Sequence, residues 1–182
     1  INKDNLNDYI LSKHPLHEGF KFLSEIHKAD YLRTYFMNFY GGGYSDIKYT
    51  DKSWIPFYNK LFSNKNKLCI GYRELKSSFR ENIFGDWENN KHKAIGNGMY
   101  IFKPNTPLTN EWYSTMMKKM DKILPKLKKY PSKTPRQVYS KYYPYPLNWT
   151  ELLGDIFIPC INKYHKYVLQ GLPHADFNRK YK

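Results

Sequence analysis

Cysteine is scarce in this chain of 182 residues, and long apolar runs are missing from it. The two cysteines, Cys69 and Cys160, stand in unrelated sequence contexts, so we expect neither a disulfide framework nor a cysteine zinc site. No apolar run approaches the roughly 20 residues that span a bilayer, and the polar start is unlike a secretory signal. These features predict a protein of a reducing, cytoplasmic compartment that can meet a membrane only at its periphery.

Acidic residues are few in comparison with basic ones. The 30 Lys+Arg against 16 Asp+Glu give a formal net charge of +14. Such a charge attracts anions, for example a nucleotide diphosphate, a nucleic acid, or an acidic membrane or polysaccharide. A second explanation is a biased genome, because the abundant Lys, Asn, Tyr and Ile are all encoded by A/T-rich codons. Net charge alone therefore identifies no partner.

No internal repeat and no low-complexity linker interrupts the chain. With 41% hydrophobic and 18% aromatic residues it has the composition of a folded protein, and its length suffices for a buried core. We therefore expect one domain over residues 1–182. Because the first residue is Ile1 and not methionine, we also expect a fragment or a processed chain that lacks its N-terminal part.

The stretch from Lys28 to Thr50 holds the densest group of candidate site residues. Apolar residues three or four positions apart predict a helix from Glu18 to Tyr40. Gly41–Gly43 then end the helix, because glycine allows positive φ and a sharp reversal. The predicted buried stripe of the helix consists of Phe22, Ile26, Ala29, Leu32, Phe36 and Phe39.

An extended segment, predicted from residue 44 to 49, follows the glycines. It places Tyr44, Asp46 and Lys48 on one face. The helix holds Asp30 and Arg33 three residues apart, on neighbouring turns. These polar groups are carried towards one end of a strand and one end of a helix, where α/β folds usually bind ligands.

The two motifs of this stretch are A-D-x-x-R from Ala29 to Arg33 and G-G-x-Y-x-D-x-K from Gly41 to Lys48. Together they resemble the signature of the glycosyltransferases with a DXD sugar-binding region. That family includes yeast-type mannosyltransferases, capsular polysaccharide enzymes and the clostridial toxin glucosyltransferases. Its usual motif ends in D-x-D, whereas Lys48 replaces the second aspartate here.

The resemblance implies an α/β fold of the GT-A type, with a mixed central sheet flanked by helices. It implies a hexosyltransferase that uses a nucleotide-diphosphate sugar as donor and a hydroxyl of a glycan or another acceptor, with retention of anomeric configuration. In the family, a strand–helix–strand unit that holds the nucleotide base precedes these motifs, and here it is either missing or replaced. No catalytic base is assigned. The donor-binding residues that the resemblance predicts are Asp30, Arg33, Gly42, Tyr44, Asp46, Lys48 and Asn97.

A metal ion is the second expectation that the resemblance raises. Paired aspartates usually hold Mn²⁺ or Mg²⁺ against the two phosphates of the donor, but here Asp46 is the single predicted metal ligand. Our hypothesis is that the ammonium of Lys48 takes over part of the electrostatic role of the metal. Asp46 would then contact the ribose or a weakly held ion. The alternative is that Lys48 marks an inactive member of the family.

Each of these residues also has a purely structural explanation. Asp30 and Arg33 can form an intrahelical ion pair of small energetic value. Tyr44 can belong to the core, and Asn97 in its Gly-Asn-Gly sequence can be a turn former.

Two further segments contain candidates for acceptor or lid residues. The sequence from Asn148 to Glu151 resembles the tryptophan-bearing loop that closes such sites, which makes Trp149 and Glu151 candidates, although a helix cap with an anchoring aromatic is the alternative. His174 and Asp176 form an H-x-D sequence that could contact a metal or phosphate. A polar chain end is more often simply solvated.

The rest of the chain predicts helices and strands in alternation. We expect helices at 4–12, 52–62, 106–124 (stopped by Pro125), 134–142 and 150–158, strands at 68–72, 94–103 and 167–172, and an irregular or partly helical stretch at 73–93.

Other function classes fit the sequence less well. A nucleic-acid-binding module would explain the charge and the many tyrosines, but the cations are distributed along the chain without a matching motif, so we expect no specific nucleic acid. A hydrolase or nuclease would need a motif such as HExxH or GxSxG, and neither occurs. A non-catalytic carbohydrate-binding protein derived from a transferase remains the main alternative.

Overall fold

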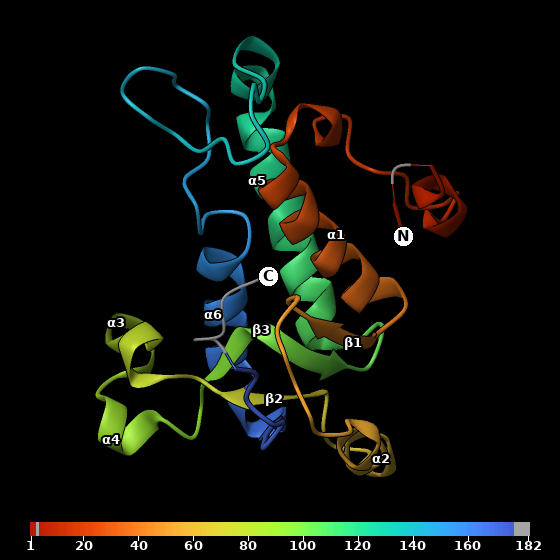
Figure 1. Cartoon of the computed structure of the whole chain (residues 1–182), viewed down its shortest axis with the longest axis vertical. Helices are drawn as coiled ribbons and strands as arrows, with labels where there is room; N and C mark the ends of the chain where they lie inside the picture. Colours follow the sequence, from red (N-terminus) through yellow and green to blue (C-terminus); the bar gives the residue numbers. More distant parts are fainter. Residues whose placement is uncertain (3, 177–182) are drawn as a thin grey trace.

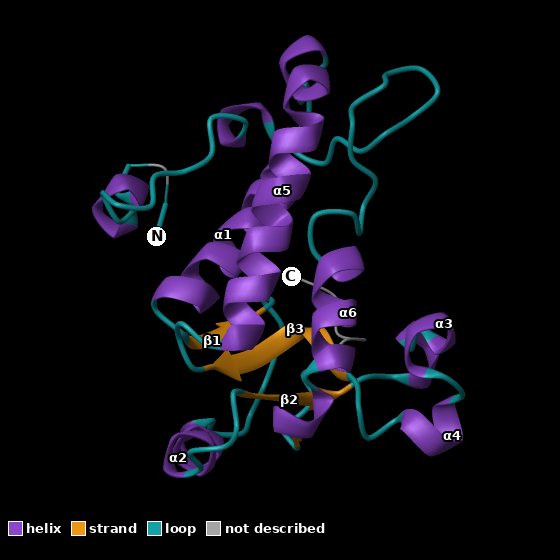
Figure 2. Ribbon diagram, turned by 180° about the vertical axis from the view of Figure 1, so that it is seen from behind, coloured by secondary structure: helices purple, strands orange, loops and turns teal. Residues whose placement is uncertain are grey.

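The computed structural model describes residues 1–2 and 4–176 and shows a mixed α/β fold, as the sequence predicts. Its elements are α1 (Glu25–Phe39), β1 (Gly42–Ser45), α2 (Ile55–Ser63), β2 (Cys69–Arg73), α3 (Glu81–Phe84), α4 (Trp87–Asn90), β3 (Ile95–Phe102), α5 (Pro107–Lys129), α6 (Gly154–Lys163) and β4 (Val168–Gln170), with 3₁₀ helices at Leu6–Tyr9, Phe20–Phe22, Lys76–Ser78 and His165–Tyr167. The strands form one open sheet in the order β1-β3-β2-β4. β3 is antiparallel to β1 and β2, whereas β4 is parallel to β2 (Figures 1 and 2).

The central strand β3 is buried on both faces of the sheet. Its side chains alternate, so that Tyr100 and Phe102 enter one core while Met99 and Ile101 enter another. The first core is shared with α1, α5 and α6, and the second with α2 and the segment that follows β4. The largest partners are Trp112 and Phe157 in the first core, and Leu61, Ile70, Tyr72 and Leu172 in the second.

Helix α1 starts later and buries a different face than the sequence predicts. It begins at Glu25 instead of Glu18, because Leu23 and Ser24 are extended. The predicted apolar stripe is only partly covered, and Ala29 within it is exposed. The buried face is polar and aromatic, and its phenols find partners in the segment before the helix: Leu11 N–H donates to the Tyr35 hydroxyl at 2.8 Å, and His17 N–H to the Tyr31 hydroxyl at 3.0 Å. The residues of α1 that are buried are His27, Asp30, Tyr31, Thr34, Tyr35, Met37 and Asn38.

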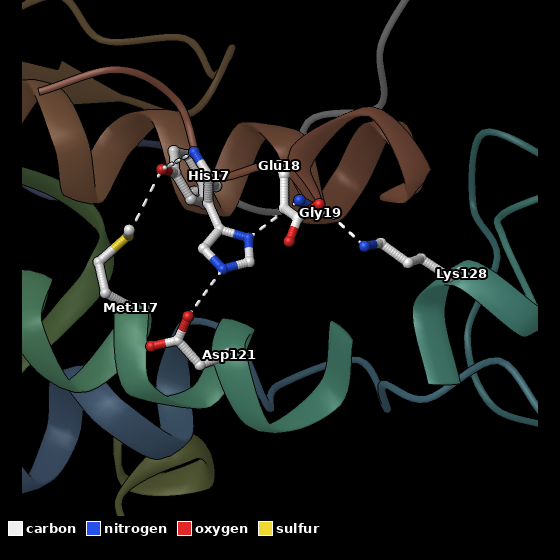
Figure 3. A network of polar contacts seen from close by, with 7 residues as sticks. His17, Glu18, Gly19, Met117, Asp121 and Lys128 are labelled. Carbon is white, nitrogen blue, oxygen red and sulfur yellow. Dashed lines mark hydrogen bonds and ion pairs between the residues drawn. The ribbon is translucent and has the colours of Figure 1, made fainter. Parts of the chain in front are cut away.

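A polar network fixes the segment before α1 against α5 (Figure 3). The backbone N–H of Gly19 donates to Nδ1 of His17 at 2.9 Å, so the proton of the neutral ring lies on Nε2, 3.0 Å from Oδ1 of Asp121. The hydroxyl of Tyr31 accepts from the His17 N–H at 3.0 Å. Glu18 pairs with Lys128 at 2.9 Å. These contacts set the position of α1 along α5.

Two helices continue past a proline that lies just beyond their predicted ends. α5 passes Pro125 and runs to Lys129, because the fully buried Leu127 anchors its last turn. The start at Thr106–Pro107 is confirmed, with Thr106 and Thr109 forming a reciprocal cap. α6 begins at Gly154 instead of Thr150 and contains Pro159 in its interior.

The predicted helices at 134–142 and 4–12 are wrong. Residues 134–142 form turns, because their backbone groups bond to distant segments: Ile26 N–H donates to Pro135 O at 3.3 Å, and Tyr139 N–H to Leu147 O at 2.7 Å. In the first segment only the 3₁₀ helix Leu6–Tyr9 forms. The expected partly helical character of 73–93 is confirmed by α3 and α4.

The predicted strands at 68–72, 94–103 and 167–172 correspond to β2, β3 and β4. The extended segment expected at 44–49 begins earlier, because β1 covers Gly42–Ser45, and Tyr49 makes an isolated bridge with Asp176. Within the described part of the chain, every helix is too short or too polar to cross a bilayer.

Candidate functional site

A cavity of about 320 Å³ lies where α1, the end of β1, β3 and the start of α6 meet. It brings together residues that are far apart in the sequence, including four of the predicted donor-binding residues and the lid candidate Trp149. Charged and polar side chains thus share the cavity with an exposed tryptophan. The lining residues are Ile26, Ala29, Asp30, Arg33, Asp46, Asn97, Trp149, Thr150, Leu153 and Gly154.

Arg33 connects the polar groups of this cavity. Its Nη2 lies 3.1 Å from Oδ1 of Asp30, and its Nη1 donates to the carbonyl oxygen of Asn97 at 3.0 Å. Nη1 also lies 4.0 Å from Oδ1 of Asp46. The guanidinium is 4.3 Å above the ring centre of Tyr44. Among the described residues its Nε atom has no hydrogen-bond partner, although it is buried. One side chain therefore joins α1, β3 and the segment after β1.

Asp30 is almost completely buried, with 7% of its surface exposed. Burial raises its pKa from 3.8 to about 6, because the loss of hydration disfavours the carboxylate. The charge of Arg33 acts in the opposite direction, and the charge of Asp46 adds to the effect of burial. The carboxyl group of Asp30 therefore takes up a proton more readily than an exposed carboxyl group does, and perturbed pKa values of this kind cluster at functional sites.

Asp46 is positioned by the two strands beneath it. Its N–H donates to Gly98 O at 2.8 Å, and its Oδ1 accepts from the Tyr44 hydroxyl at 2.8 Å. A Cβ atom at Gly98 would lie 3.1 Å from its Oδ2, so the missing side chain leaves room for the carboxylate. The ring of Tyr44 stacks on Tyr100 at 5.4 Å. Tyr44 thus supports both Arg33 and Asp46 at the edge of the first core.

The loop that carries Trp149 is held by a buried histidine that sequence reasoning missed. Nε2 of His27 donates to Asn148 O at 3.0 Å. Its Nδ1 accepts from the Ser24 and Tyr145 hydroxyls, at 2.9 and 3.1 Å. Burial lowers the pKa of His27, whereas the bond to Asn148 acts to raise it. The neutral ring therefore ties α1 to the loop, and a histidine on a predicted polar helix face gave no signal of this contact.

Several residues that the sequence predicts for the site do not line the cavity in the part of the chain that the structure describes. Gly42, at φ +86°, pairs with Phe102 in the sheet. Lys48 donates its N–H to Asp46 O at 2.7 Å, but its side chain does not line the cavity. Glu151 accepts from Asn148 N–H at 2.7 Å and from Lys119 Nζ at 3.2 Å, so it fixes the Trp149 loop from behind.

The two candidates near the chain end lie outside this cavity. His174 lines a separate cavity of about 500 Å³ with Lys52 and Arg73, and its ring meets Tyr72 edge-on at 5.0 Å. Asp176 donates its N–H to Tyr49 O at 3.0 Å. Neither position reaches the group around Arg33.

A second, mostly apolar cavity of about 490 Å³ adjoins the first and shares Ala29 and Arg33 with it. Its apolar character comes from the α1 stripe that the sequence predicts as core. The other lining residues are Ile1, Tyr9, Leu32, Phe36, Met37, Tyr40, Gly41, Gly43 and Tyr44.

The described side chains contain no group of three or more His, Cys, Asp and Glu residues that could hold a metal ion. Comparisons of the chain with protein-family models, with curated proteins and with solved structures find no match. The chemistry of the site is therefore argued from its own side chains: two carboxylates, one guanidinium, one amide and one indole around a common space.

Proposed function

We propose that this cavity binds the sugar of a nucleotide-diphosphate donor, and that the protein is a GT-A-type glycosyltransferase. It moves a hexose to a hydroxyl of a glycan or another acceptor. The observation that supports this most directly is the shared cavity of Asp30, Arg33, Asp46 and Asn97 with Trp149 above them. Carboxylates, amides and guanidinium groups are the hydrogen-bond partners that sugar hydroxyls need, and an indole packs against the apolar side of a sugar ring.

The guanidinium of Arg33 fits the leaving group of such a reaction, although two carboxylates line the same cavity. Negative charge builds on the nucleotide diphosphate as the sugar departs, and fixed donors aimed at it stabilise the transition state. Arg33 is the cation among the described residues that line the cavity. Lys48, two residues after Asp46, does not line the cavity, and we propose it as a second cation that acts on the diphosphate from outside the cavity. A bound Mn²⁺ or Mg²⁺ would supply the same kind of stabilisation, with Asp46 as its contact.

The apolar cavity on the other side of Arg33 is proposed to receive the nucleoside. Aromatic walls suit a nucleobase, which can stack on their faces. Tyr9, Phe36, Tyr40 and Tyr44 surround this space, and the hydroxyl of Tyr40 donates to Tyr9 O at 2.9 Å. The diphosphate would then pass Arg33, which both cavities share.

Thermal shift against UDP-, GDP- and other nucleotide sugars tests the function, because selective binding stabilises the native state. We expect one donor class to raise the melting temperature, and Asn97→Ala to reduce that shift. Tyr142→Ser serves as the matched control, because Tyr142 is exposed and does not line either cavity. If oligosaccharides stabilise the protein and no nucleotide sugar does, the protein is a carbohydrate-binding relative and the transferase proposal is wrong.

The role of Lys48 is tested separately with a donor hydrolysis or transfer assay. We expect activity to persist in EDTA and to fall in Lys48→Ala. Complete loss of activity on chelation, with full recovery on adding Mn²⁺, would overturn the hypothesis that Lys48 replaces the metal ion. The transferase proposal would stay intact.

A further inference from the structure

Basic residues occur along the whole chain, but more than half of the net positive charge comes from one segment. Residues 118–141 contain nine lysines and arginines and a single acidic residue, Asp121, which is a net +8 of the +14 of the chain. They form the second half of α5 and the loop after it. This part, which we name the basic lobe, projects from the body at the end opposite α2 (Figures 1 and 2).

Four of the six lysines of α5 in the basic lobe form one stripe. Lys118, Lys122, Lys126 and Lys129 recur four, four and three residues apart, so they lie within about one quarter of the helix circumference. The buried residues Trp112, Met116, Met120 and Leu127 occupy the opposite face. The stripe is thus held outwards by the packing of the helix.

The stripe is not neutralised by acidic side chains within the described part of the chain. The two α5 lysines beside it do have partners, since Lys119 pairs with Glu151 and Lys128 with Glu18. No ion pair of the described residues includes a cation of the stripe. The same holds for Lys133, Arg136 and Lys141 in the loop. Seven exposed cations of the basic lobe therefore have no carboxylate partner among the residues that the structure describes.

Tyrosines lie between these cations. The side chains of Tyr139 and Tyr142 are 49% and 84% exposed, and an ammonium group covers a face of each ring, Lys126 at 5.9 Å and Lys141 at 4.9 Å. Phenol rings with a polar tip are favoured at the headgroup level of a bilayer.

We propose that the basic lobe docks the protein on a membrane of anionic phospholipid. The lobe is a helix end with a loop that projects from the body (Figure 2), and a projecting surface suits a bilayer better than the groove that tracks a single-stranded nucleic acid. Each lysine or arginine near an anionic surface adds to the attraction, and the attraction falls off within a Debye length. The inference is independent of the transferase activity.

Cosedimentation with phosphatidylcholine vesicles, with and without phosphatidylserine, tests the proposal. We expect binding only to the anionic vesicles, with a steep loss at high salt. Replacing the four stripe lysines by glutamine should weaken binding about a hundredfold or more, because each cation is worth roughly a factor of five. The matched control replaces the same number of exposed lysines elsewhere, Lys52, Lys60, Lys65 and Lys76, and should bind as the wild type does.

Equal weakening in the two lysine variants would overturn the proposal, because it would show a response to net charge alone. Preference for a single-stranded RNA oligonucleotide over anionic vesicles would overturn it in favour of nucleic acid. Thermal unfolding of each variant checks the fold. If the stripe variant fails to fold, the double variant Arg136→Gln/Lys141→Gln is used instead, because both residues lie in the loop outside any helix. Unchanged vesicle binding by this double variant would reject the basic lobe as the docking surface.

Discussion

Nε2 of His27 lies 3.0 Å from the carbonyl oxygen of Asn148, the residue before Trp149, although 121 positions separate the two in the sequence. This hydrogen bond joins the helix that carries Asp30 and Arg33 to the loop that covers them. The cavity therefore depends on a residue that does not line it.

Replacing His27 by alanine tests this dependence. The change leaves Asn148 O, Ser24 and Tyr145 without their shared partner, and an unsatisfied buried group costs about 1–3 kcal/mol. We expect a lower free energy of unfolding and a weaker response to nucleotide sugars. Gln at this position can still donate to Asn148 and should recover part of both. A His27→Ala protein with wild-type stability and donor binding would show that the contact does not position the loop.

Asp30→Asn should stabilise the ligand-free protein while weakening donor binding. Burial raises the pKa of Asp30 to about 6. At neutral pH the ionised carboxylate therefore costs more free energy in the folded protein than in the unfolded chain. Removal of that charge is expected to add about 1–3 kcal/mol to the free energy of unfolding at pH 7. Chemical denaturation measures the change. A destabilised Asp30→Asn protein would mean that the pair with Arg33 outweighs the loss of hydration.

The pH dependence of this stabilisation has a defined direction. Between the unfolded pKa near 4 and the folded pKa near 6, native Asp30 binds more protons than unfolded Asp30, so its contribution to stability falls as pH rises. His27 acts oppositely, because its lowered pKa makes stability rise with pH up to about 6.5. The histidine is present in both proteins and cancels in their difference. The difference in the free energy of unfolding between Asp30→Asn and the wild type should therefore grow from near zero at pH 4 to its full value by pH 7.

Arg33→Lys should damage both the fold and the site, because an ammonium cannot reproduce the planar set of contacts to Asp30, Asn97 O and the Tyr44 ring. We expect a loss of about 1–3 kcal/mol in stability and at least a tenfold weaker donor affinity. In the Asp30→Asn background the same change should cost less, since one charged partner is already gone. Additive effects of the two substitutions would argue against the coupling.

The sequence predicted those parts of the fold that local patterns control. The strands β2 and β3 follow from short apolar runs between turn residues, and the start of α5 follows from Thr106 and Pro107. The buried face of α1 did not follow from its apolar residues. Its partners, such as Leu11 for Tyr35, come from outside the helix and satisfy polar groups that hydropathy places at the surface.

The candidate site was predictable where one motif specified both residue type and spacing. Asp30, Arg33 and Asp46 lie together because α1 and β1 are joined by a short glycine turn. Lys48 lies beyond the end of β1, where the alternation of the strand no longer fixes its direction towards the cavity. His27 could not be found, because its partners Asn148 and Tyr145 are set by tertiary packing alone.

The two glycines of the Gly-Asn-Gly sequence around Asn97 should respond differently to alanine. At Gly96 a Cβ atom would lie 1.9 Å from Cζ of Tyr72, which forces the ring or the strand to move. We expect Gly96→Ala to destabilise the protein by about 1–3 kcal/mol or more. Tyr72→Leu should relieve most of that loss, because it removes the clashing atoms.

At Gly98 the added Cβ would meet Oδ2 of Asp46 at 3.1 Å, a contact that a shift of a few tenths of an ångström relieves. Stability should therefore change by no more than about 0.5 kcal/mol, whereas donor affinity should fall several-fold because the carboxylate is displaced in the cavity. Unfolding curves and donor titrations of Gly96→Ala and Gly98→Ala separate the two effects. If Gly98→Ala left donor affinity unchanged while Asp30→Asn abolished it, Asp46 would not be part of the donor site, and the cavity would bind its ligand through α1 and Asn97 alone.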